Sequence, residues 1–145
     1  MEPPDPRFEE RVRESFAKQE FMATIGARLA KVAPGEVVIE LPFRADLVQQ
    51  HGFLHAGLVT AVVDSACGYA ALSLMPPGAA VLSVEFKVNL LKPAAGPAFR
   101  AVGKVIRAGR TLTVCSGELE VPGKGSVVAV MQATMMTILD RPLAD

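Results

Sequence analysis

Residues 52–71 read GFLHAGLVTAVVDSACGYAA, and this stretch decides how the rest of the chain is interpreted. Apart from Asp64, the run from Ala56 to Leu74 is almost entirely small or apolar, which predicts one long buried helix. Met75-Pro76-Pro77-Gly78 ends it, because proline cannot extend a helix and also restrains the residue before it. A helix that is apolar all round must be covered all round. We therefore expect a sheet curved about it and a second subunit over the remainder.

The sequence on both sides of this helix predicts the strands of that sheet. Before it, Phe8, Val12 and Phe16 recur every four residues and predict a short helix over 7–19. Two strands are expected over 24–32 and 36–41, joined by a Pro-Gly turn and followed by a loop over 42–50. After the long helix, four apolar runs separated by glycine or proline turns are typical of an antiparallel meander: 81–91, 99–106, 111–121 and 127–139. The order predicts an α+β fold.

Composition narrows the class of protein. The 145 residues fit one domain, residues 1–145, and a chain that is 50% hydrophobic can bury a core without metal or disulfide help. A net charge of zero argues against a nucleic-acid-binding protein. Cys67 and Cys115 lie in apolar runs, as buried free thiols do, and residues 1–20 contain no apolar signal-peptide segment. We expect a cytoplasmic protein that does not enter the membrane, because Asp64 interrupts the longest apolar stretch.

Asp64 is the main functional candidate. A carboxylate among Val62, Val63 and Ala66 is costly unless it is paired or hydrogen-bonded, so it has either a catalytic or a local structural role, and the pattern alone leaves both open. Ala56 stands near the helix N-terminus, where unpaired backbone N–H groups can bind a developing oxyanion. The two residues are eight positions apart, about 12 Å along a helix axis. They can act together only if an acceptor site lies between them, or if Asp64 meets the N-terminus of a partner subunit's helix.

Other reactive side chains have plainer interpretations. Ser65, Cys67 and Tyr69 are read as packing residues, since no Gly-x-Ser-x-Gly turn surrounds the serine. His51 and His55 are four residues apart, but no other histidine exists and the spacing falls in a loop. We therefore expect no metal site.

Several of these runs together resemble the PaaI-type hotdog thioesterases. The family signature is G-x-x-H-G-G followed by a small-residue helix that carries aspartate, and residues 52–71 match it. The runs SVEFKVNLLKPA (83–94), VIRAGRTLTVCSGELEV (105–121) and VAVMQATMM (128–136) are similar to the family's strands. The resemblance covers about residues 43–139. It implies a hotdog fold, in which the sheet wraps the long helix, with dimers or tetramers whose active sites lie between subunits.

The resemblance also implies roles for single residues. Asp64 matches the catalytic carboxylate, acting as nucleophile or general base, and Ala56 matches the position whose backbone N–H faces the thioester oxygen. Gln49 matches a polar loop position that orients water or the carboxylate. His55 matches the motif histidine, with an orienting role. The chain has Ala56-Gly57 where the family usually has Gly-Gly, which matters if this position needs a positive φ.

Further positions concern the substrate. Ser83 matches a hydroxyl near the site in some members, and Gly109 and Arg110 fall on a turn that often lies near the CoA nucleotide. Seven basic and three acidic residues lie between Glu85 and Lys124, a surplus suited to phosphates. Arg107 and Arg110 are the best phosphate candidates.

The resemblance implies hydrolysis of an acyl-CoA to free acid and CoA, with no cofactor. The acyl group is left open between aryl and short or medium alkyl, and the side chains expected along its pocket are Phe53, Leu54, Tyr69 and Leu72. Two alternatives remain. A hotdog hydratase or dehydratase would use a histidine across the interface, but the sequence has no D-x-N-x-x-H pattern. A non-catalytic acyl-CoA-binding module would not need Asp64.

Overall fold

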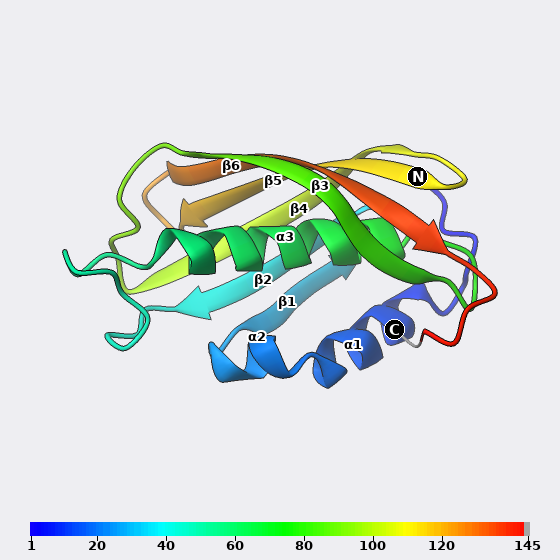
Figure 1. Ribbon diagram of the computed structural model, residues 1–145, viewed down its shortest axis with the longest axis horizontal. Helices are drawn as coiled ribbons and strands as arrows, with labels where there is room; N and C mark the ends of the chain where they lie inside the picture. Colours follow the sequence, from blue (N-terminus) through cyan, green and yellow to red (C-terminus); the bar gives the residue numbers. More distant parts are fainter. Residues whose placement is uncertain (144–145) are drawn as a thin grey trace.

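One long helix lies against a curved six-stranded sheet (Figure 1). The computed structural model describes residues 1–143. The helix is α3, Ala56–Leu72, and the strand order is β1-β2-β4-β5-β6-β3, with every neighbouring pair antiparallel. The strand bounds are β1 Arg28–Ala33, β2 Glu36–Pro42, β3 Ala80–Leu90, β4 Ala98–Ala108, β5 Leu112–Val121 and β6 Ser126–Ile138. The predicted α+β class, with an antiparallel sheet wrapped about a central helix, is confirmed.

Two glycines let the sheet approach the helix closely. A Cβ added at Gly103 in β4 would lie 2.3 Å from the carbonyl atoms of Ala66, and one at Gly117 in β5 would lie 2.6 Å from a methyl of Val63. Helix α3 contributes Val63, Ala66 and Cys67 to this contact, all fully buried. Because Gly103 and Gly117 have no side chains and the helix residues that face them are small, the helix packs tightly against the sheet here.

Helix α3 ends two residues earlier than its apolar pattern indicates. Ser73 stops it by accepting the N–H of Gly35 at 2.8 Å and donating to the carbonyl of Ala70 at 2.6 Å. From α1, the guanidinium of Arg11 donates to the carbonyls of Leu72, Met75 and Pro76 at 2.6–2.9 Å. These bonds hold the end of α3 and the turn after it against α1 and the turn between β1 and β2.

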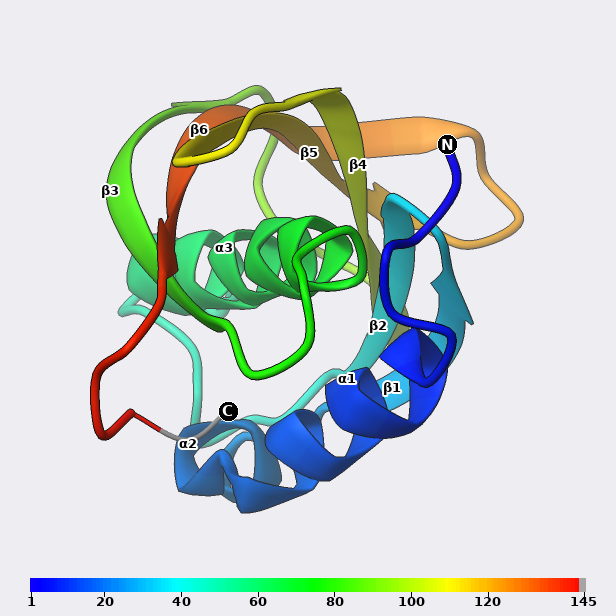
Figure 2. The ribbon, with the colours of Figure 1, turned by 90° about the vertical axis from the view of Figure 1, so that its right-hand side faces the viewer.

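The N-terminal region differs from the sequence-based prediction. Helix α1, Phe8–Lys18, lies within the predicted range, but a second short helix, α2, covers Glu20–Thr24. The strand predicted over 24–32 therefore begins only at Arg28, after a turn at Gly26 with φ +75°. The prediction was wrong here because the partial alternation of this segment continues through a turn of helix. Both helices lie on the side of α3 that the sheet leaves open (Figure 2), so the chain itself covers part of the surface expected for a second subunit.

Strand β3 forms an edge of the sheet and is exposed along most of its length. On the face that carries α3, Phe86 and Leu90 are 45% and 52% exposed. Within residues 1–143, no helix is both long and apolar enough to cross a membrane. The predicted domain range, 1–145, extends two residues beyond the described part.

Candidate active site

Asp64 lies at mid-length on α3, on the side turned away from the closest sheet contact. Its neighbours Val62, Val63, Ala66 and Cys67 are fully buried, whereas Asp64 itself is only partly buried. One carboxylate oxygen, Oδ1, accepts a hydrogen bond of 2.7 Å from the hydroxyl of Ser83 on β3. The structure therefore brings together two predicted site residues that are nineteen positions apart in the sequence.

Burial raises the pKa of the Asp64 carboxyl above its ordinary value, and the hydrogen bond from Ser83 opposes this by stabilising the charged form. A carboxylate with a raised pKa is a stronger base once it is ionised. Ser83 also lies 3.3 Å from the sulfur of Met135, through which β6 contributes to the packing of the hydroxyl. Burial therefore makes the ionised Asp64 carboxylate a stronger base than an exposed aspartate.

A small pocket of about 120 Å³ opens beside Asp64. Its walls come from α3, from β3 and from the residue between α1 and α2, and they consist of Gln19, Asp64, Ser65, Gly68, Tyr69, Val81 and Ser83. Tyr69, one of the side chains expected along the acyl pocket, lines this pocket. Leu72 does not: it is fully buried in the core, so that prediction was wrong. Gln19 and Gly68 were not predicted, because no periodicity or motif connects Gln19 to a helix that starts 37 residues later.

The start of α3 carries the second group of predicted residues. His55 caps the helix, and its Nδ1 accepts the N–H of Gly57 at 2.8 Å. A Cβ at position 57 would lie 2.9 Å from that nitrogen, so glycine makes room for the histidine ring. The backbone N–H of Ala56 has no acceptor within residues 1–143. Ala56 has a negative φ, so alanine in place of the usual glycine is not strained here. Of the two amides, that of Ala56 remains available to an oxyanion.

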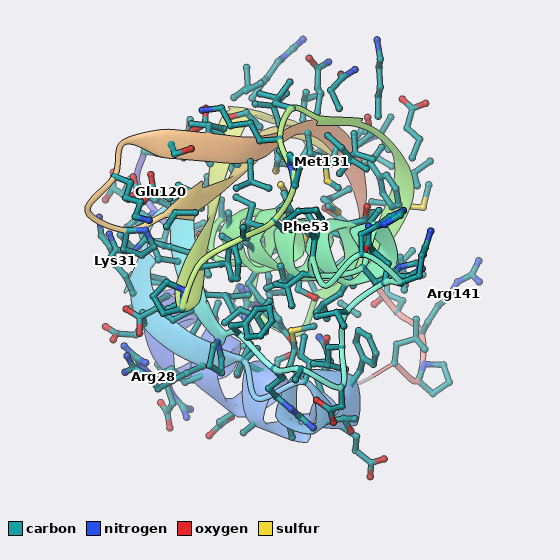
Figure 3. The ribbon with its side chains drawn as sticks, turned by 90° about the vertical axis from the view of Figure 1, so that its left-hand side faces the viewer. Arg28, Lys31, Phe53, Glu120, Met131 and Arg141 are labelled. Atoms are coloured by element: carbon teal, nitrogen blue, oxygen red, sulfur yellow. The ribbon has the colours of Figure 1, made fainter. Side chains whose placement is uncertain are left out.

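Gln49 lies close to Ala56 across the loop that precedes α3. A tight turn with Gly52 at φ +85° folds the loop back, so that the Gln49 N–H donates to the carbonyl of Phe53 at 2.8 Å. The side-chain oxygen of Gln49 accepts the N–H of His51. Figure 3 looks on to this end of the molecule, where Phe53 lies in front of α3. A mainly apolar pocket of about 460 Å³ opens here, lined by residues that include Gln49, Phe53, Leu54 and Ala56.

The two groups do not meet within one protomer. Asp64 and Ser83 line one pocket, Gln49 and Ala56 line the other, and the two pockets share no residue. Eight residues of one helix separate Ala56 from Asp64, about 12 Å along the axis. The chain on its own therefore holds two separate groups of predicted site residues.

The predicted CoA-binding residues lie at the other end of α3. Arg107, Gly109 and Arg110 are exposed at the hairpin between β4 and β5, which the Gly109 N–H closes by donating to the Leu112 carbonyl at 2.9 Å. This hairpin projects beyond the C-terminal end of α3 (Figure 1). Within one protomer it is remote from Gln49 and Ala56.

The largest hollow, about 550 Å³, contains none of the predicted site residues. It follows the solvent-facing side of the sheet, where charged side chains pair with one another, as Lys31 does with Glu36 at 2.7 Å. Lys31 and Glu120 project on this outer side in Figure 3. Most of its charged side chains already form ion pairs, so the pocket of Asp64 is the better candidate for a catalytic site. Within residues 1–143, no three His, Cys, Asp or Glu side chains gather as metal ligands.

Comparison with known proteins places this geometry in a family. The model of the thioesterase superfamily matches residues 51–128, the segment that runs from the capped start of α3 into β6. The chain belongs to the thioesterase superfamily. A crystal structure of a thioesterase family protein from Silicibacter pomeroyi is 50% identical, with 91% of this chain and 98% of that one covered and a TM-score of 0.88.

Other similar proteins are more distant. A protein of Saccharolobus solfataricus whose assigned name is that of an esterase is 28% identical, over 75% of this chain and 78% of its own. The Escherichia coli PaaI protein, from the phenylacetic acid degradation operon, is 19% identical with a TM-score of 0.84 over 92% of this chain and 94% of its own. That likeness concerns the fold, which is the hotdog fold predicted from the sequence. Thioester hydrolysis is the general activity that this membership supports.

Proposed function

We propose that the protein hydrolyses an acyl-CoA thioester, with an aryl or a short to medium acyl group, to the free acid and CoA. The observation that carries the proposal is the partly buried Asp64 carboxylate, held by the Ser83 hydroxyl at 2.7 Å beside a pocket. A thioester needs only one such carboxylate and a donor for the oxyanion, because the thiolate leaves readily. No metal or cofactor enters the scheme.

Two routes use the same carboxylate. In one, an oxygen of Asp64 attacks the thioester carbon, CoA departs as thiolate and water then cleaves the mixed anhydride. In the other, Asp64 takes a proton from a water molecule that attacks the carbon directly. In both, the carbonyl oxygen becomes negative and accepts a hydrogen bond from the unpaired N–H of Ala56. Gln49 orients the water or the carboxylate from the loop beside Ala56.

The Ala56 that serves a given Asp64 belongs to a second copy of the chain. Strand β3 supports this, because it is an unpaired edge with Phe86 and Leu90 exposed on the face that carries the helix. Two copies of this edge can pair antiparallel about a two-fold axis, as identical surfaces do in most dimers. The apolar side chains of each edge would then be covered by the other copy. The assembly is a dimer or a dimer of dimers.

In this proposed pairing, one register of the two β3 strands joins the two groups of site residues. Ser83 lies beside Asp64, and Leu90 lines the pocket of Gln49 and Ala56. An axis midway between Ser83 and Leu90 places the Ser83 of one copy opposite the partner's Leu90, and so brings the partner's larger pocket to Asp64. The helices then run antiparallel, which also brings the exposed Arg107 and Arg110 near the partner's end of the site. Their guanidinium groups, with the turn at Gly109, would bind the phosphates of CoA.

Release of CoA from a panel of aryl- and alkyl-CoA esters, followed with a thiol-reactive dye, tests the proposal. The dye reports CoA cleanly because Cys67 and Cys115 are fully buried, and burial raises the pKa of Cys115 to about 12. Unpaired thiols also suit the cytoplasm, where we place the protein. Asp64→Asn and Asp64→Ala should each lower kcat at least ~10²-fold, the scale of a lost chemical group.

The matched control is Asp46→Asn, which makes the same exchange at an exposed carboxylate paired with Arg44. It should turn over normally. Near-normal turnover in both Asp64 variants would refute the assignment. A wild-type protein that binds acyl-CoA esters without releasing CoA would instead be a binding module, and one that adds or removes water across the acyl chain would be a hydratase.

A further inference from the structure

Gln19 reaches the pocket of Asp64 from outside the segment that carries the family match. It is the single residue between α1 and α2, with φ −81° and ψ 95°, and this extended backbone breaks the helical path. The two helices lie on the open side of α3 (Figure 2). The break therefore directs one polar side chain from the N-terminal region toward the helix that carries Asp64.

Both ends of the Gln19 amide are bound to α3. Its Nε2 donates to the hydroxyl of Tyr69 at 3.0 Å, and its Oε1 accepts the hydroxyl of Ser65 at 3.2 Å. Ser65 and Tyr69 are four residues apart and so lie one above the other on the same face of the helix. The ring of Tyr69 is held in turn by Phe16, with ring centroids 5.7 Å apart in an edge-to-face arrangement. The side chain is therefore fixed across one turn of α3, starting at the residue next to Asp64.

The Gln19 amide, bonded to Ser65 and Tyr69, forms a clamp in the wall of the small pocket. Gln19, Ser65 and Tyr69 line it together with Asp64, and Gly68 provides much of the space between them. A Cβ added at Gly68 would meet no atom within 4 Å, so the helix leaves open volume where another residue would place a methyl group. The size of the pocket thus depends on two positions: the Gln19 side chain limits it, and the lack of a side chain at Gly68 leaves it open.

The volume limits what can enter. A protein cavity of about 150 Å³ holds a benzene molecule, and the pocket beside Asp64 has about 120 Å³. Of the two arms of an acyl-CoA ester, the CoA arm must reach solvent, so only the acyl arm can end against Gln19 and Tyr69. One ring or a short alkyl chain fills this space.

We propose that Gln19 is a specificity-determining residue that sets the upper size of the acyl group, with Gly68 setting the width of its pocket. This inference rests on the function proposed above and narrows its substrate class to compact acyl groups. Gln19 acts by exclusion, since a longer chain would have to displace an amide that is hydrogen-bonded at both ends. The residue that joins the short helices α1 and α2 thus forms part of the substrate pocket.

The test compares kcat/KM over straight-chain acyl-CoA esters from two to twelve carbons for three variants. Gln19→Ala removes the clamp and should raise the ratio of long-chain to short-chain kcat/KM about tenfold or more, the scale of one methylene gained in a pocket. Gly68→Ala fills the open volume and should shift the profile the other way by a similar factor. Gln132→Ala is the matched control, because this glutamine is exposed on the outer face of β6. It should keep the wild-type profile.

The outcomes separate this inference from the proposed function. A wild-type protein that hydrolyses acyl-CoA esters while both pocket variants retain its chain-length profile overturns the role of Gln19 and leaves the function standing. A wild-type protein that hydrolyses none of the esters overturns both. Should Gln19→Ala fail to fold, Gly68→Ala decides alone, since alanine stabilises a helix relative to glycine and meets no neighbouring atom. A loss of activity equal for all chain lengths also counts against the proposal.

Discussion

Replacing Ser83 with alanine removes one hydroxyl and leaves the rest of the site in place. The O–H of Ser83 donates to Oδ1 of Asp64 at 2.7 Å and stabilises the ionised carboxylate. Burial raises the pKa of Asp64, and Ser83 holds that rise in check, so the variant should have a still higher pKa at this carboxyl. Both proposed routes need the ionised form. The acid side of the pH profile should therefore move to higher pH in Ser83→Ala.

The strength of the Ser83–Asp64 hydrogen bond determines how far kcat/KM should fall in Ser83→Ala. A hydrogen bond to a charged group contributes about 1.5–3 kcal/mol, and we expect the lower value because Asp64 is only partly buried. About 1.4 kcal/mol corresponds to a factor of ten, so kcat/KM on the acid side should fall about tenfold. Well above the carboxyl pKa, Asp64 is ionised in both proteins, and the ratio of their rates should approach one.

The assay is kcat/KM for one good ester, measured from acid to mildly alkaline pH by CoA release. Ser116→Ala is the matched control, because this serine lies on the solvent-facing side of β5. Its profile should coincide with that of the wild type. If Ser83→Ala lost the same factor at every pH, Ser83 would act on the substrate instead of on the ionisation of Asp64, and the reasoning would be refuted.

Three further predictions concern stability and assembly. Because burial raises the pKa of Asp64 in the folded state, its ionisation lowers the stability of the protein as pH rises above about 3.9, the pKa of an unfolded Asp. Asp64→Asn should therefore have a higher Tm than the wild type at pH 7 but not at pH 3. A lower Tm of the variant at pH 7 would contradict this. Gly103→Ala would put a Cβ 2.3 Å from the backbone of Ala66 and should lower the free energy of unfolding by about 3 kcal/mol or more, whereas Gly68→Ala should not lower it. Equal midpoints of urea unfolding for the two variants would contradict this prediction. Light scattering should find at least a dimer. Phe86→Lys, on the exposed face of β3, should shift the protein toward the monomer and lower its turnover. A wild-type monomer that is fully active would contradict an active site shared between two copies of the chain.

The sequence was sufficient where the pattern is local. Glycine and proline turns between apolar runs separate the strands, and small residues around Asp64 predict the buried helix, so β2 to β6 and α3 lie within about two residues of the expected ranges. The motif around His55 also indicated the start of α3, because capping is decided by neighbouring residues. The sequence-based prediction was wrong at residues 24–27, where the partial alternation of a predicted strand falls on the last residue of α2 and the turn that follows it.

Only the tertiary structure decided which residues share a pocket. Ser83 meets Asp64 because β3 pairs with β6 at the sheet edge and so crosses the middle of α3, and Gln19 meets Ser65 and Tyr69 because α1 and α2 fold over the open side of that helix. Such contacts depend on packing between distant segments, which no spacing along the chain records. The sequence by itself identified Asp64 as a carboxylate with either a catalytic or a structural role. The fold showed that the Ser83 hydroxyl donates to this carboxylate and that the Gln19 amide lies in the wall of its pocket.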